Sequence, residues 1–472
     1  MATDIEHDIE DRIERANDRP ILQDGDYVLL ILNRALRAED NPAIEAAQIH
    51  ASQLNLQLVV CSELDETVDY ASERIFYFIL GAYRELAIAL KNKNIRCVQT
   101  VRKAGDDSIL RSLMAKAAAV YTDEDYTHWD RAKIQQILDV ATQAVFLVDV
   151  ARLVPTRKLP QNLKTTPEFR KAHSKLRESY FTARQAAHRN KLKTDNIVGD
   201  IPYKHNFADY SDADLKRLVE QCQIDRDIKI SQEHPPTQAE IGKRIAILKS
   251  KILSKYKWIR NNPALEYSTS QLSPYLHFGM VSPHQILAEI NSSDVPKSYT
   301  WKFRDEFLTW REWSHYQAFY NPNLHIYDSL PAEAKKTLAD HAEDSRPDLC
   351  SFEAILNGNT SDRTWNAAQR EWFNTGWLHN NLRMYWAKQI LRYTKTPQEA
   401  WDIACYLNDR LSIDGRDPAT YASIRWAFGD GKPGYSEKPI YGKVASKSDR
   451  AILKREGMKQ WIEARTSQAS SE

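Results

Sequence analysis

Residue types that are costly to bury recur together in the C-terminal part of this 472-residue chain. Trp365 and Trp386 lie on stretches with helical spacing, and Arg383, Asn408 and Asp414 fall between or after them. An ordinary hydrophobic core has no use for an arginine, an amide and an acid in one neighbourhood, because each loses hydration on burial. The combination is therefore typical of a helical pocket that holds a redox cofactor.

Composition limits the class of protein. The chain carries 65 Lys and Arg against 64 Asp and Glu, and a net charge of +1 argues against a histone-like polyelectrolyte. A neutral total still allows a local basic groove, since nucleic-acid affinity depends on where the charges sit. The sequence has no apolar run of roughly 18 residues, so no membrane span is predicted.

The N-terminus and the cysteines bear on the compartment. Residues 1–20 are highly charged and lack an apolar stretch, so they do not resemble a secretory signal. The cysteines are scattered and form no Cys-x-x-Cys pair, which disfavours a disulfide framework, a cysteine-held metal and an iron–sulfur cluster. We therefore expect an intracellular, cytoplasmic protein with reduced thiols and no metal site.

Short apolar runs alternate with helical stretches from residue 25 to residue 150. The predicted strands are 27–32, 58–61, 95–101, 119–121 and 144–148, and the predicted helices are 41–54, 68–91, 107–118 and 129–141. This alternation predicts an α/β domain with a Rossmann-like parallel sheet. No Gly-x-Gly-x-x-Gly turn follows a strand, so its crevice is expected to hold a smaller ligand than a dinucleotide, or none.

The remaining segments differ in composition. Residues 1–24 are predicted to form a charged extension, frayed or helical at the surface, and residues 151–235 a polar linker with helical pieces. Residues 236–472 have mostly helical patterns, and every tryptophan except Trp129 lies from Trp258 onward. The expected architecture is therefore an α/β domain followed by an all-α domain that carries the chemistry.

Several motifs carry a family resemblance. Ser270-Gln-Leu-Ser-Pro-Tyr-Leu-His-Phe-Gly279 is similar to the flavin-phosphate loop of photolyases and cryptochromes. The chain most resembles the class II cyclobutane pyrimidine dimer photolyases through Trp365-Asn-Ala-Ala-Gln369, Arg383-Met-Tyr-Trp-Ala-Lys388, Tyr406-Leu-Asn-Asp409 and Asp414-Gly-Arg-Asp-Pro418. The resemblance covers most of residues 25–445 and implies that the all-α domain binds FAD. The class has Asn-Gly where this chain has Ala419-Thr420, which leaves the subfamily open.

The resemblance implies a pyrophosphate loop before one helix. It comprises Thr269, Ser270, Leu272 and Ser273, and Tyr256 stands where the family has an accompanying aromatic side chain. Hydroxyls and backbone N–H groups ahead of a helix favour an anion. A plain helix cap at Ser273 is the alternative.

The resemblance also implies how the flavin ring is held. An asparagine at the position of Asn408 faces flavin N5 in the family, Arg383 and Asp414 form the supporting pair, and Arg416 belongs to the same motif. An arginine paired to an acid suits a reduced, anionic flavin. A structural ion pair between two helices is the alternative, and both interpretations can hold.

Trp365 and Trp386 stand where class II enzymes keep the two inner tryptophans of an electron-transfer chain. The outer tryptophan of the class is replaced by Tyr393, so the outer step is left open between Tyr393, Trp372 and Trp377. For any single tryptophan, core packing is the alternative role.

The lesion pocket is implied by a further set of residues. Glu306, Trp310, Met384 and Trp426 match an acid and apolar walls that suit a flipped-out thymine dimer. Around them, Arg260 and Asn261 match a DNA-facing rim, and Lys438 and Lys443 are predicted to contact DNA phosphates. A solvated lysine-rich tail is the alternative for those two lysines, and a surface position on an amphipathic helix for Glu306.

The function implied is that of a deoxyribodipyrimidine photo-lyase. Light would excite reduced FAD, which passes an electron to a flipped-out pyrimidine dimer in UV-damaged DNA; Trp365 and Trp386 would re-reduce an oxidised flavin. We expect a monomer, and we leave open a second, antenna chromophore (deazaflavin or folate). The rival functions are a cryptochrome-like blue-light photoreceptor, a six-four photoproduct photolyase with His277 and His379 as nearest candidates for its histidine pair, and a flavin-free DNA-binding protein.

Overall fold

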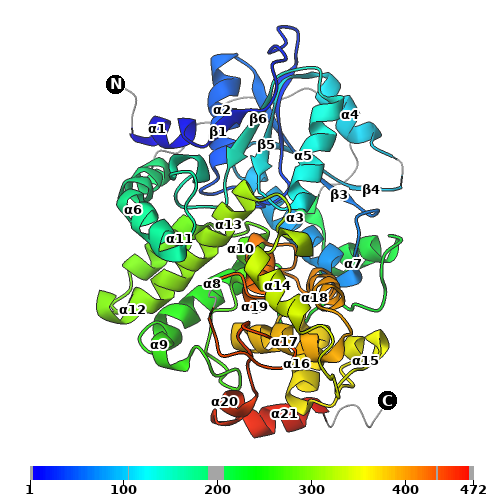
Figure 1. Cartoon of the computed structure of the whole chain (residues 1–472). Coiled ribbons are helices and arrows are strands. Elements are labelled where there is room, and N and C mark those ends of the chain that lie inside the picture. Colours follow the sequence, from blue (N-terminus) through cyan, green and yellow to red (C-terminus); the bar gives the residue numbers. More distant parts are fainter. Residues whose placement is uncertain (1–3, 105, 190–206, 432–433, 467–472) are drawn as a thin grey trace. The chain divides into compact units, whose positions relative to one another are not determined.

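The computed structural model describes the chain except residues 1–3, 105, 190–206, 432–433 and 467–472 (Figure 1). The chain divides into two compact units, and neither is continuous in sequence. Unit 1 comprises residues 1–230, 235–245 and 272–293, and unit 2 comprises residues 231–234, 246–271 and 294–472.

Unit 1 contains a six-stranded sheet in the order β1-β6-β5-β2-β3-β4. All neighbouring strands are parallel except β1, which runs antiparallel to β6. The strands are β1 (Ile13–Arg15), β2 (Tyr27–Ile31), β3 (Gln57–Asp65), β4 (Arg96–Arg102), β5 (Ala117–Glu124) and β6 (Val145–Asp149).

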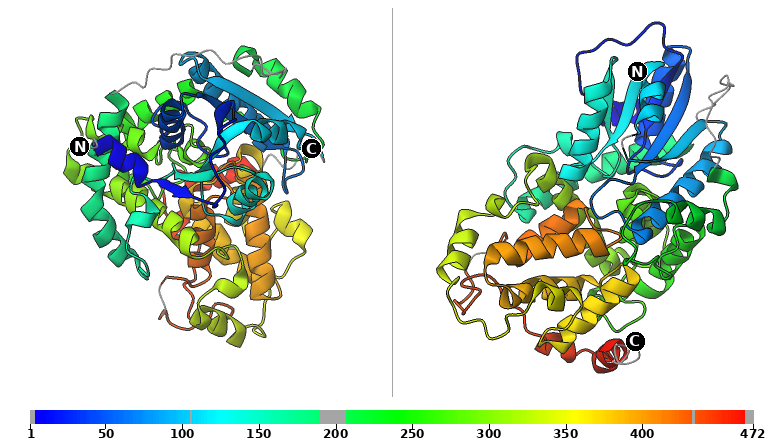
Figure 2. Two further views of the ribbon diagram at one scale, coloured as in Figure 1. Left: turned by 90° about the horizontal axis from the view of Figure 1, so that it is seen from above. Right: turned by 90° about the vertical axis from the view of Figure 1, so that its right-hand side faces the viewer.

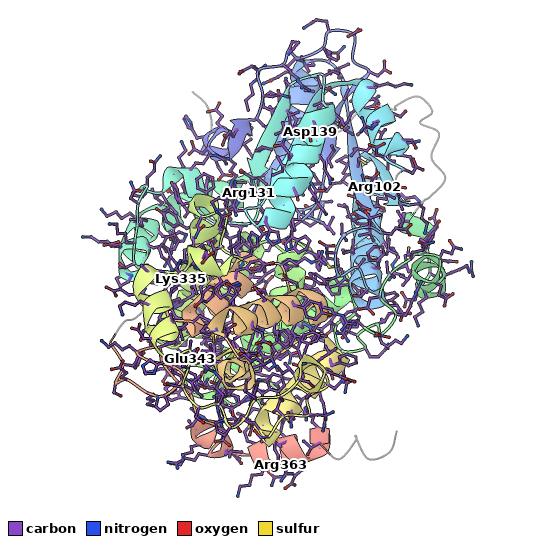
Figure 3. The ribbon with its side chains drawn as sticks, turned by 45° about the vertical axis from the view of Figure 1, so that its right-hand side comes forward. Arg102, Arg131, Asp139, Lys335, Glu343 and Arg363 are labelled. Carbon is purple, nitrogen blue, oxygen red and sulfur yellow. The ribbon has the colours of Figure 1, made fainter. Side chains whose placement is uncertain are left out.

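Helices cover both faces of this sheet (Figure 2). Every residue of β2 and of β5 is buried, which requires packing on the two faces. The crossover helices are α2 (Pro42–Gln53), α3 (Glu73–Lys91), α4 (Ser108–Ala115) and α5 (His128–Val140). Figure 3 labels Arg131 and Asp139 on α5, and Arg102 at the end of β4. The predicted α/β domain with a mostly parallel sheet is thus confirmed.

The first strand departs from the sequence-based expectation of a frayed or helical extension. Helix α1 (Asp4–Glu10) is followed by β1, in which Ile13 lies opposite Val148 of β6. Arg12 anchors this junction, because its guanidinium donates to the carbonyl oxygens of Arg152 and Leu153 at 3.0 and 2.8 Å. A three-residue strand has too little pattern to predict, and its pairing with β6 defines it.

Residues 272–293 belong to unit 1 although they follow helical sequence. They form α10 (Ser273–His277) and α11 (Pro283–Asn291). Arg37 donates to the carbonyl oxygen of Gly279 at 3.0 Å. Gly279 has φ +59, and a Cβ there would lie 2.5 Å from the carbonyl oxygen of Arg34. The glycine that ends the Ser270–Gly279 motif is therefore needed for close packing inside unit 1.

The rest of unit 1 is helical. It contains η1 (Thr156–Lys158), α6 (Thr166–Arg189), η2 (Phe207–Asp209) and α7 (Asp212–Glu220), and α8 (Gln238–Ile247) begins in it. Helix α6 is held by Arg184, whose guanidinium pairs with Asp8, Asp40 and Glu45 at 3.2, 2.8 and 2.7 Å.

The described residues of unit 2 form helices and loops without a strand, which confirms the predicted helical region. Its first elements are η3 (Leu248–Ile252), α9 (Tyr256–Ile259), α12 (Lys297–Arg304), η4 (Asp305–Trp310), α13 (Arg311–Tyr320), η5 (Tyr327–Ser329), α14 (Ala332–Asp340) and α15 (Phe352–Leu356). They are followed by α16 (Arg363–Thr375), α17 (Asn380–Tyr393), α18 (Pro397–Leu411), α19 (Pro418–Ala427), α20 (Arg450–Leu453) and α21 (Met458–Thr466). No helix among the described residues is long and apolar enough to cross a membrane.

Candidate functional site

A hydrogen-bonded cluster joins α17 to the turn after α18. Arg383 pairs with Asp414 at 2.9 Å and donates to the hydroxyl of Ser412 at 3.0 Å. Ser412 donates in turn to Asp414 at 2.8 Å and accepts the indole N–H of Trp372 at 2.9 Å. The Arg383 guanidinium also lies 5.2 Å from the Trp372 ring centroid. The structure therefore brings together the predicted Arg383–Asp414 pair and adds Ser412 and Trp372 to it.

Asn408 lies one turn before this cluster, at the end of α18. Its side-chain amide donates to the carbonyl oxygen of Ala404 at 2.8 Å, while its Oδ1 is buried without a partner among the described residues. The Nε atom of Arg383 is likewise buried and unpaired within the described part of the chain. Buried polar atoms without partners are rare in proteins, so both atoms are suited to a ligand.

The turn that carries Asp414 is packed tightly against α18. A Cβ at Gly415 would lie 2.5 Å from the carbonyl oxygen of Asn408, so only glycine fits. Arg416 follows in the left-handed region, with φ +60, and its N–H donates to Asp409 at 3.2 Å. The turn thus fixes the position of Asn408 relative to the acids that follow it.

Asp409 is a buried acid that the sequence did not single out as a site residue. The hydroxyl of Tyr421 lies 3.0 Å from both of its carboxyl oxygens. Burial raises the pKa of Asp409 to about 7, although the nearby Arg416 lowers it. The position of Asp409 directly after Asn408 was the only available signal, because burial is not visible in sequence.

Four aromatic rings form a continuous stack through α16 and α17. Trp372 meets Trp386 edge-on at 5.1 Å, Trp386 stacks on Trp365 at 5.5 Å, and Trp365 meets Tyr393 edge-on at 5.3 Å. Trp386 donates its indole N–H to Gln369 at 2.9 Å, and Trp365 donates to the carbonyl oxygen of Trp386 at 3.1 Å. These bonds hold the rings in fixed positions.

The order of the rings helps to decide which residue is the outer donor of the predicted electron-transfer chain. Trp372 lies on the Arg383 side of Trp386, at the end of the stack nearest the predicted flavin residues, which does not suit an outer donor. Tyr393 continues the stack at the other end, but it is completely buried. The sequence signal for this stack was the family position of Trp365 and Trp386; the place of Trp372 between Arg383 and Trp386 was not predicted.

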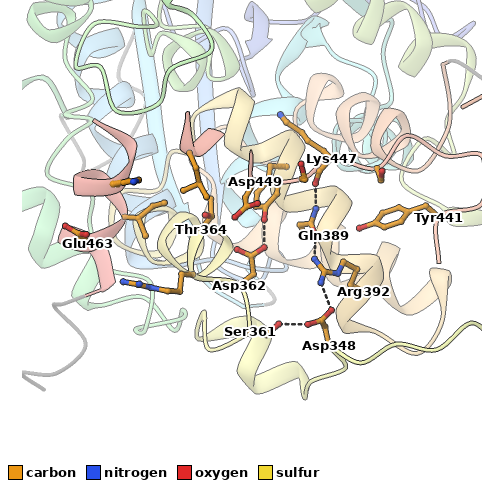
Figure 4. Close-up of a pocket in the computed structure, with 17 residues that line it drawn as sticks. Asp348, Ser361, Asp362, Thr364, Gln389, Arg392, Tyr441, Lys447, Asp449 and Glu463 are labelled. Atoms are coloured by element: carbon orange, nitrogen blue, oxygen red, sulfur yellow. Dashed lines mark hydrogen bonds and ion pairs between the residues drawn. The ribbon is translucent and has the colours of Figure 1, made fainter. Parts of the chain in front are cut away.

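A cavity of about 750 Å³ lies beside the N-terminus of α16 and near the Tyr393 end of α17 (Figure 4). Its lining mixes basic and acidic residues, among them Arg363, which is also labelled in Figure 3. Asp348 on its wall accepts from Ser361 at 2.7 Å and also pairs with Arg392 at 2.5 Å. No sequence pattern indicated this cavity.

Glu306 lies on the π-helical segment η4, together with Trp310. It pairs with Arg260 at 3.0 Å and with Lys302 at 2.7 Å. The side chain of Glu306 is 27% exposed. π-helical turns often occur at functional sites, and η4 is such a turn. The structure also places the predicted residues Arg260 and Glu306 in direct contact.

Trp310 and Trp426 form the second predicted pair. Their rings meet edge-on at 5.5 Å, and both are half-buried. A Cβ at Gly431 would lie 2.4 Å from the Trp426 ring, so the backbone lies directly against it. Met384 is half-buried on α17, next to Arg383 in sequence.

Tyr256 and Asn261, predicted for the cofactor and the DNA-facing rim, make different contacts. Tyr256 packs edge-on against Phe303 at 5.1 Å, and its pKa is raised by burial and by Glu306, so it belongs with the Glu306 cluster. The carbonyl oxygen of Asn261 accepts from the Asn381 side chain at 2.7 Å.

The predicted phosphate loop crosses the division between the units. Thr269 and Ser270 belong to unit 2, while Leu272 and Ser273 belong to unit 1, and Gln271 between them has φ +51. Helix α10 begins at Ser273, and the residue at its N-cap position is Leu272.

The two C-terminal lysines are exposed. Lys438 donates to Ser446 at 2.9 Å, and the backbone N–H of Lys443 donates to Thr337 at 3.0 Å. The histidines considered for a six-four site differ in surroundings. His277 contacts Arg34 inside unit 1, whereas burial lowers the pKa of His379 to about 3, with Lys447 and Arg260 adding to the effect.

Sequence comparisons point to one family. A profile described as DNA photolyase matches residues 28–188. A deoxyribodipyrimidine photo-lyase of Methanothermobacter thermautotrophicus is 29% identical over 461 residues, covering 96% of this chain and 97% of that protein. One of Arabidopsis thaliana is 41% identical over 201 residues, covering 41% of this chain and 40% of that protein.

Solved structures share the fold. A bacterial class III photolyase from Agrobacterium tumefaciens aligns with a TM-score of 0.66 at 17% identity, covering 94% of this chain and 87% of that one. An archaeal photolyase from Sulfolobus tokodaii, solved with two FAD molecules, aligns with a TM-score of 0.61 at 17% identity and covers 94% of both chains. These likenesses establish the two-part architecture.

Proposed function

We propose that the chain is a member of the photolyase and cryptochrome family, and that it is a deoxyribodipyrimidine photo-lyase that repairs cyclobutane pyrimidine dimers in DNA under light. The observation that carries the proposal is the pair of buried polar atoms without partners in the described chain, Arg383 Nε and Asn408 Oδ1, beside the Arg383–Asp414 ion pair. An arginine, an amide and an acid fixed at one place fit a flavin ring, and the resemblance assigns them to FAD.

Reduced FAD, when bound, supplies an electron on excitation by light. In unit 2, Arg383 and Asp414 would hold the charge of the reduced ring, and Asn408 would present its free Oδ1 to the ring edge. Thr269 and Ser270 would contact the phosphates. The assignment of Leu272, Ser273, Tyr256 and Arg416 to the cofactor rests on sequence resemblance.

The substrate end of the site is proposed at η4 and α19. Trp310 and Trp426 offer flat, half-exposed surfaces on which a flipped dimer would stack, and Met384 would add a further wall. Glu306, held by Arg260 and Lys302, would hydrogen-bond the pyrimidine edge. Asn261, Lys438 and Lys443 would contact the DNA backbone.

The aromatic stack has a separate proposed role. Trp386 and Trp365 would pass an electron inward to restore an oxidised flavin, with Tyr393 as the proposed outer member. A second chromophore, deazaflavin or folate, stays a prediction, as does the monomeric state.

The test is a repair assay with the purified protein. Its absorption spectrum should show bound flavin, and after reduction it should split thymine dimers in irradiated DNA only in the light. A yellow protein that fails to split dimers would favour the photoreceptor, and a colourless protein would favour a flavin-free DNA-binding protein. Repair of six-four photoproducts in place of cyclobutane dimers would favour the six-four photolyase.

The phosphate assignment has its own test. The hydroxyls of Ser270 and Ser273 are the groups in question, so the double substitution Ser270→Ala and Ser273→Ala should weaken flavin retention. Flavin occupancy equal to that of the wild type would contradict the phosphate loop while leaving the Arg383–Asn408 assignment standing.

A further inference from the structure

Tyr385 is a buried phenol beside the aromatic stack, and no sequence pattern singled it out. It directly precedes Trp386 on α17. Its hydroxyl donates to the Oδ2 atom of Asp362, the residue that caps α16. The other oxygen of this carboxylate accepts the backbone N–H of Trp365 at 3.0 Å. One carboxylate therefore connects the phenol of Tyr385 to a residue that carries an inner ring of the stack.

The same acid lies near a second phenol but is hydrogen-bonded to only one of them. Burial raises the pKa of Tyr385 and of Tyr393, and the charge of Asp362 raises both further, so both phenols are protonated at neutral pH. Tyr385 donates its proton to the carboxylate. The hydroxyl of Tyr393 is buried and makes no hydrogen bond to an acid among the described residues.

This difference decides which phenol can give up an electron. An oxidised phenol is a strong acid, so its oxidation is easy only where a base at the hydroxyl takes the proton in the same step. Tyr385 has such a base in Asp362. Tyr393 has the ring contact to Trp365 at 5.3 Å but not the base.

The Tyr385–Asp362 pair also borders the cavity of about 750 Å³ beside α16. Both residues line this cavity, and Figure 4 shows Asp362 on its wall. Asp362 is half-buried, whereas Trp365 and Tyr393 are completely buried. A cavity of this size has room for water and for a small molecule. A soluble reductant can therefore reach the pair while the rings of the stack stay dry.

We propose that Tyr385 is the terminal electron donor of the aromatic stack and that Asp362 takes its proton. The inference rests on the proposed function, in which photoreduction leaves the stack one electron short at the Trp365 indole. The phenol of Tyr385 passes one electron to the oxidised indole. Its O–H bond breaks and the proton moves to the carboxylate of Asp362, which leaves a neutral phenoxyl radical and a carboxylic acid.

The cavity gives the reverse step a route. A thiolate in the cavity gives one electron to the phenoxyl radical of Tyr385 and becomes a thiyl radical. Asp362 returns the proton to the phenoxyl oxygen, so the pair is restored and the thiol is the net reductant.

The first test follows radicals after a light flash in the full-length protein with its bound flavin oxidised. Transient absorption separates phenoxyl from indole radicals, and electron paramagnetic resonance with ring-deuterated tyrosine identifies the phenoxyl. Wild type should form a phenoxyl radical, and more slowly in heavy water because a proton moves. Tyr385→Phe should lose this radical and leave a long-lived indole radical, whereas Tyr393→Phe should still form it.

Asp362→Asn tests the base without removing the helix cap. Asparagine is as good a cap as aspartate and can still accept the N–H of Trp365, but it cannot take the phenol proton. Oxidation of Tyr385 should slow by roughly a hundredfold or more, as expected when a positioned base is removed. The matched control is Tyr441→Phe, because Tyr441 lines the same cavity and has no hydrogen bond to an acid in the described chain. It should behave as wild type.

A second test does not depend on the flavin. A ruthenium(III) polypyridyl complex, generated by a flash, oxidises indoles and phenols of the protein as purified, whether or not flavin is bound. The long-lived phenoxyl signal should be smaller in Tyr385→Phe and in Asp362→Asn than in Tyr441→Phe. Equal thermal unfolding temperatures of the three variants would exclude a change in folding as the cause.

The outcomes separate this inference from the proposed function. A wild-type yield of phenoxyl radical in Tyr385→Phe would overturn the inference, and so would its loss in Tyr393→Phe alone. An unchanged oxidation rate in Asp362→Asn would overturn the role of the acid. A protein that binds no flavin or repairs no dimer, but shows the stated losses under ruthenium oxidation, would contradict the proposed function and keep the Tyr385–Asp362 pair.

Discussion

Within unit 2, the aromatic stack around Trp386 and the cluster around Glu306 differ in their exposure to solvent. Trp365, Trp386 and Tyr393 are completely buried, and the two indoles donate to neutral groups of the protein. Trp310 and Trp426 are half-exposed and lie on the side where Glu306 is held by two cations.

This contrast agrees with the two proposed roles, electron transfer through the stack and dimer binding beside Glu306. A side chain that only passes electrons gains from a dry, fixed position, because no surrounding water must reorganise when its charge changes. A side chain that must receive a base has to stay open to solvent until the base arrives. Substitutions should therefore disable the two regions separately.

The largest expected effect comes from breaking the stack. Trp386→Phe replaces the indole that contacts both Trp365 and Trp372 by a phenyl ring that is much harder to oxidise, so photoreduction of oxidised flavin should be abolished or strongly slowed. Repair by chemically reduced protein should stay close to wild type, because the repair electron does not start on Trp386. The measurement is flavin bleaching under light with a thiol reductant. Tyr393→Phe serves as the comparison; a normal rate in Tyr393→Phe would exclude Tyr393 as the outer donor.

The Glu306 cluster should respond in the reverse way. Glu306→Ala removes the proposed hydrogen bond to the dimer and leaves Arg260 and Lys302 without their shared carboxylate. The yield of dimer splitting per absorbed photon should fall by up to roughly a hundredfold, the lower end of the range seen when one stabilising group is removed from an active site. Photoreduction should be unaffected. An unchanged splitting yield at equal flavin occupancy would remove Glu306 from the mechanism.

Asp409 extends the comparison to pH, because it lies in the buried region and carries a titratable group. Its pKa is raised from 3.8 to about 7, so the stability it contributes is fully present below about pH 4 and is lost as the pH rises through 7. Wild type should therefore lose roughly 2 kcal/mol between pH 5 and pH 7 relative to Asp409→Asn. Urea unfolding at both pH values measures this. The control variant Asp340→Asn, at an exposed ion pair with Lys336, should show the same change in unfolding free energy between the two pH values as wild type. If Asp409→Asn shows that change too, the Asp409 carboxyl does not titrate as stated.

The lesion walls are expected to give smaller effects. Trp310→Ala or Trp426→Ala should weaken binding of dimer-containing DNA by about 1 kcal/mol, at the lower end for base stacking, because each ring already covers part of the other. Affinity for undamaged duplex should hardly change. Equal weakening on both DNAs, measured by competition, would mean that the rings support the fold rather than the lesion.

Some features were visible in the sequence because they depend on local pattern. The buried strand at residues 144–148 was predicted within one residue of β6, since a short apolar run between two helical stretches is typical of a buried parallel strand. The Arg383–Asp414 pair was predicted from the family motif and is present at 2.9 Å. In contrast, β1 depends on its pairing with β6, and its three residues carry no signal of their own.

Other features depend on the tertiary fold alone. The place of Trp372 in the stack and the burial of Asp409 follow from how α16, α17 and α18 pack, which no single segment encodes. Trp258 and Trp301 belong to two different segments, and only the packing of α9 on α12 shows that both rings lie near Lys257. Basic residues were sought instead at the C-terminus, where lysines are dense in sequence.

The smallest effect is expected from those C-terminal lysines, and it sharpens the contrast between a general and a specific contact. Lys438 and Lys443 are exposed, whereas Lys257 lies beside the Trp258 and Trp301 rings. If both C-terminal lysines contact phosphates, Lys438→Ala with Lys443→Ala should weaken damaged and undamaged duplex equally and lower the salt slope by about one per lysine. Titrations at several salt concentrations provide the measurement. A slope equal to wild type would show that these lysines are only solvated, and the DNA-facing charge would then lie with Arg260.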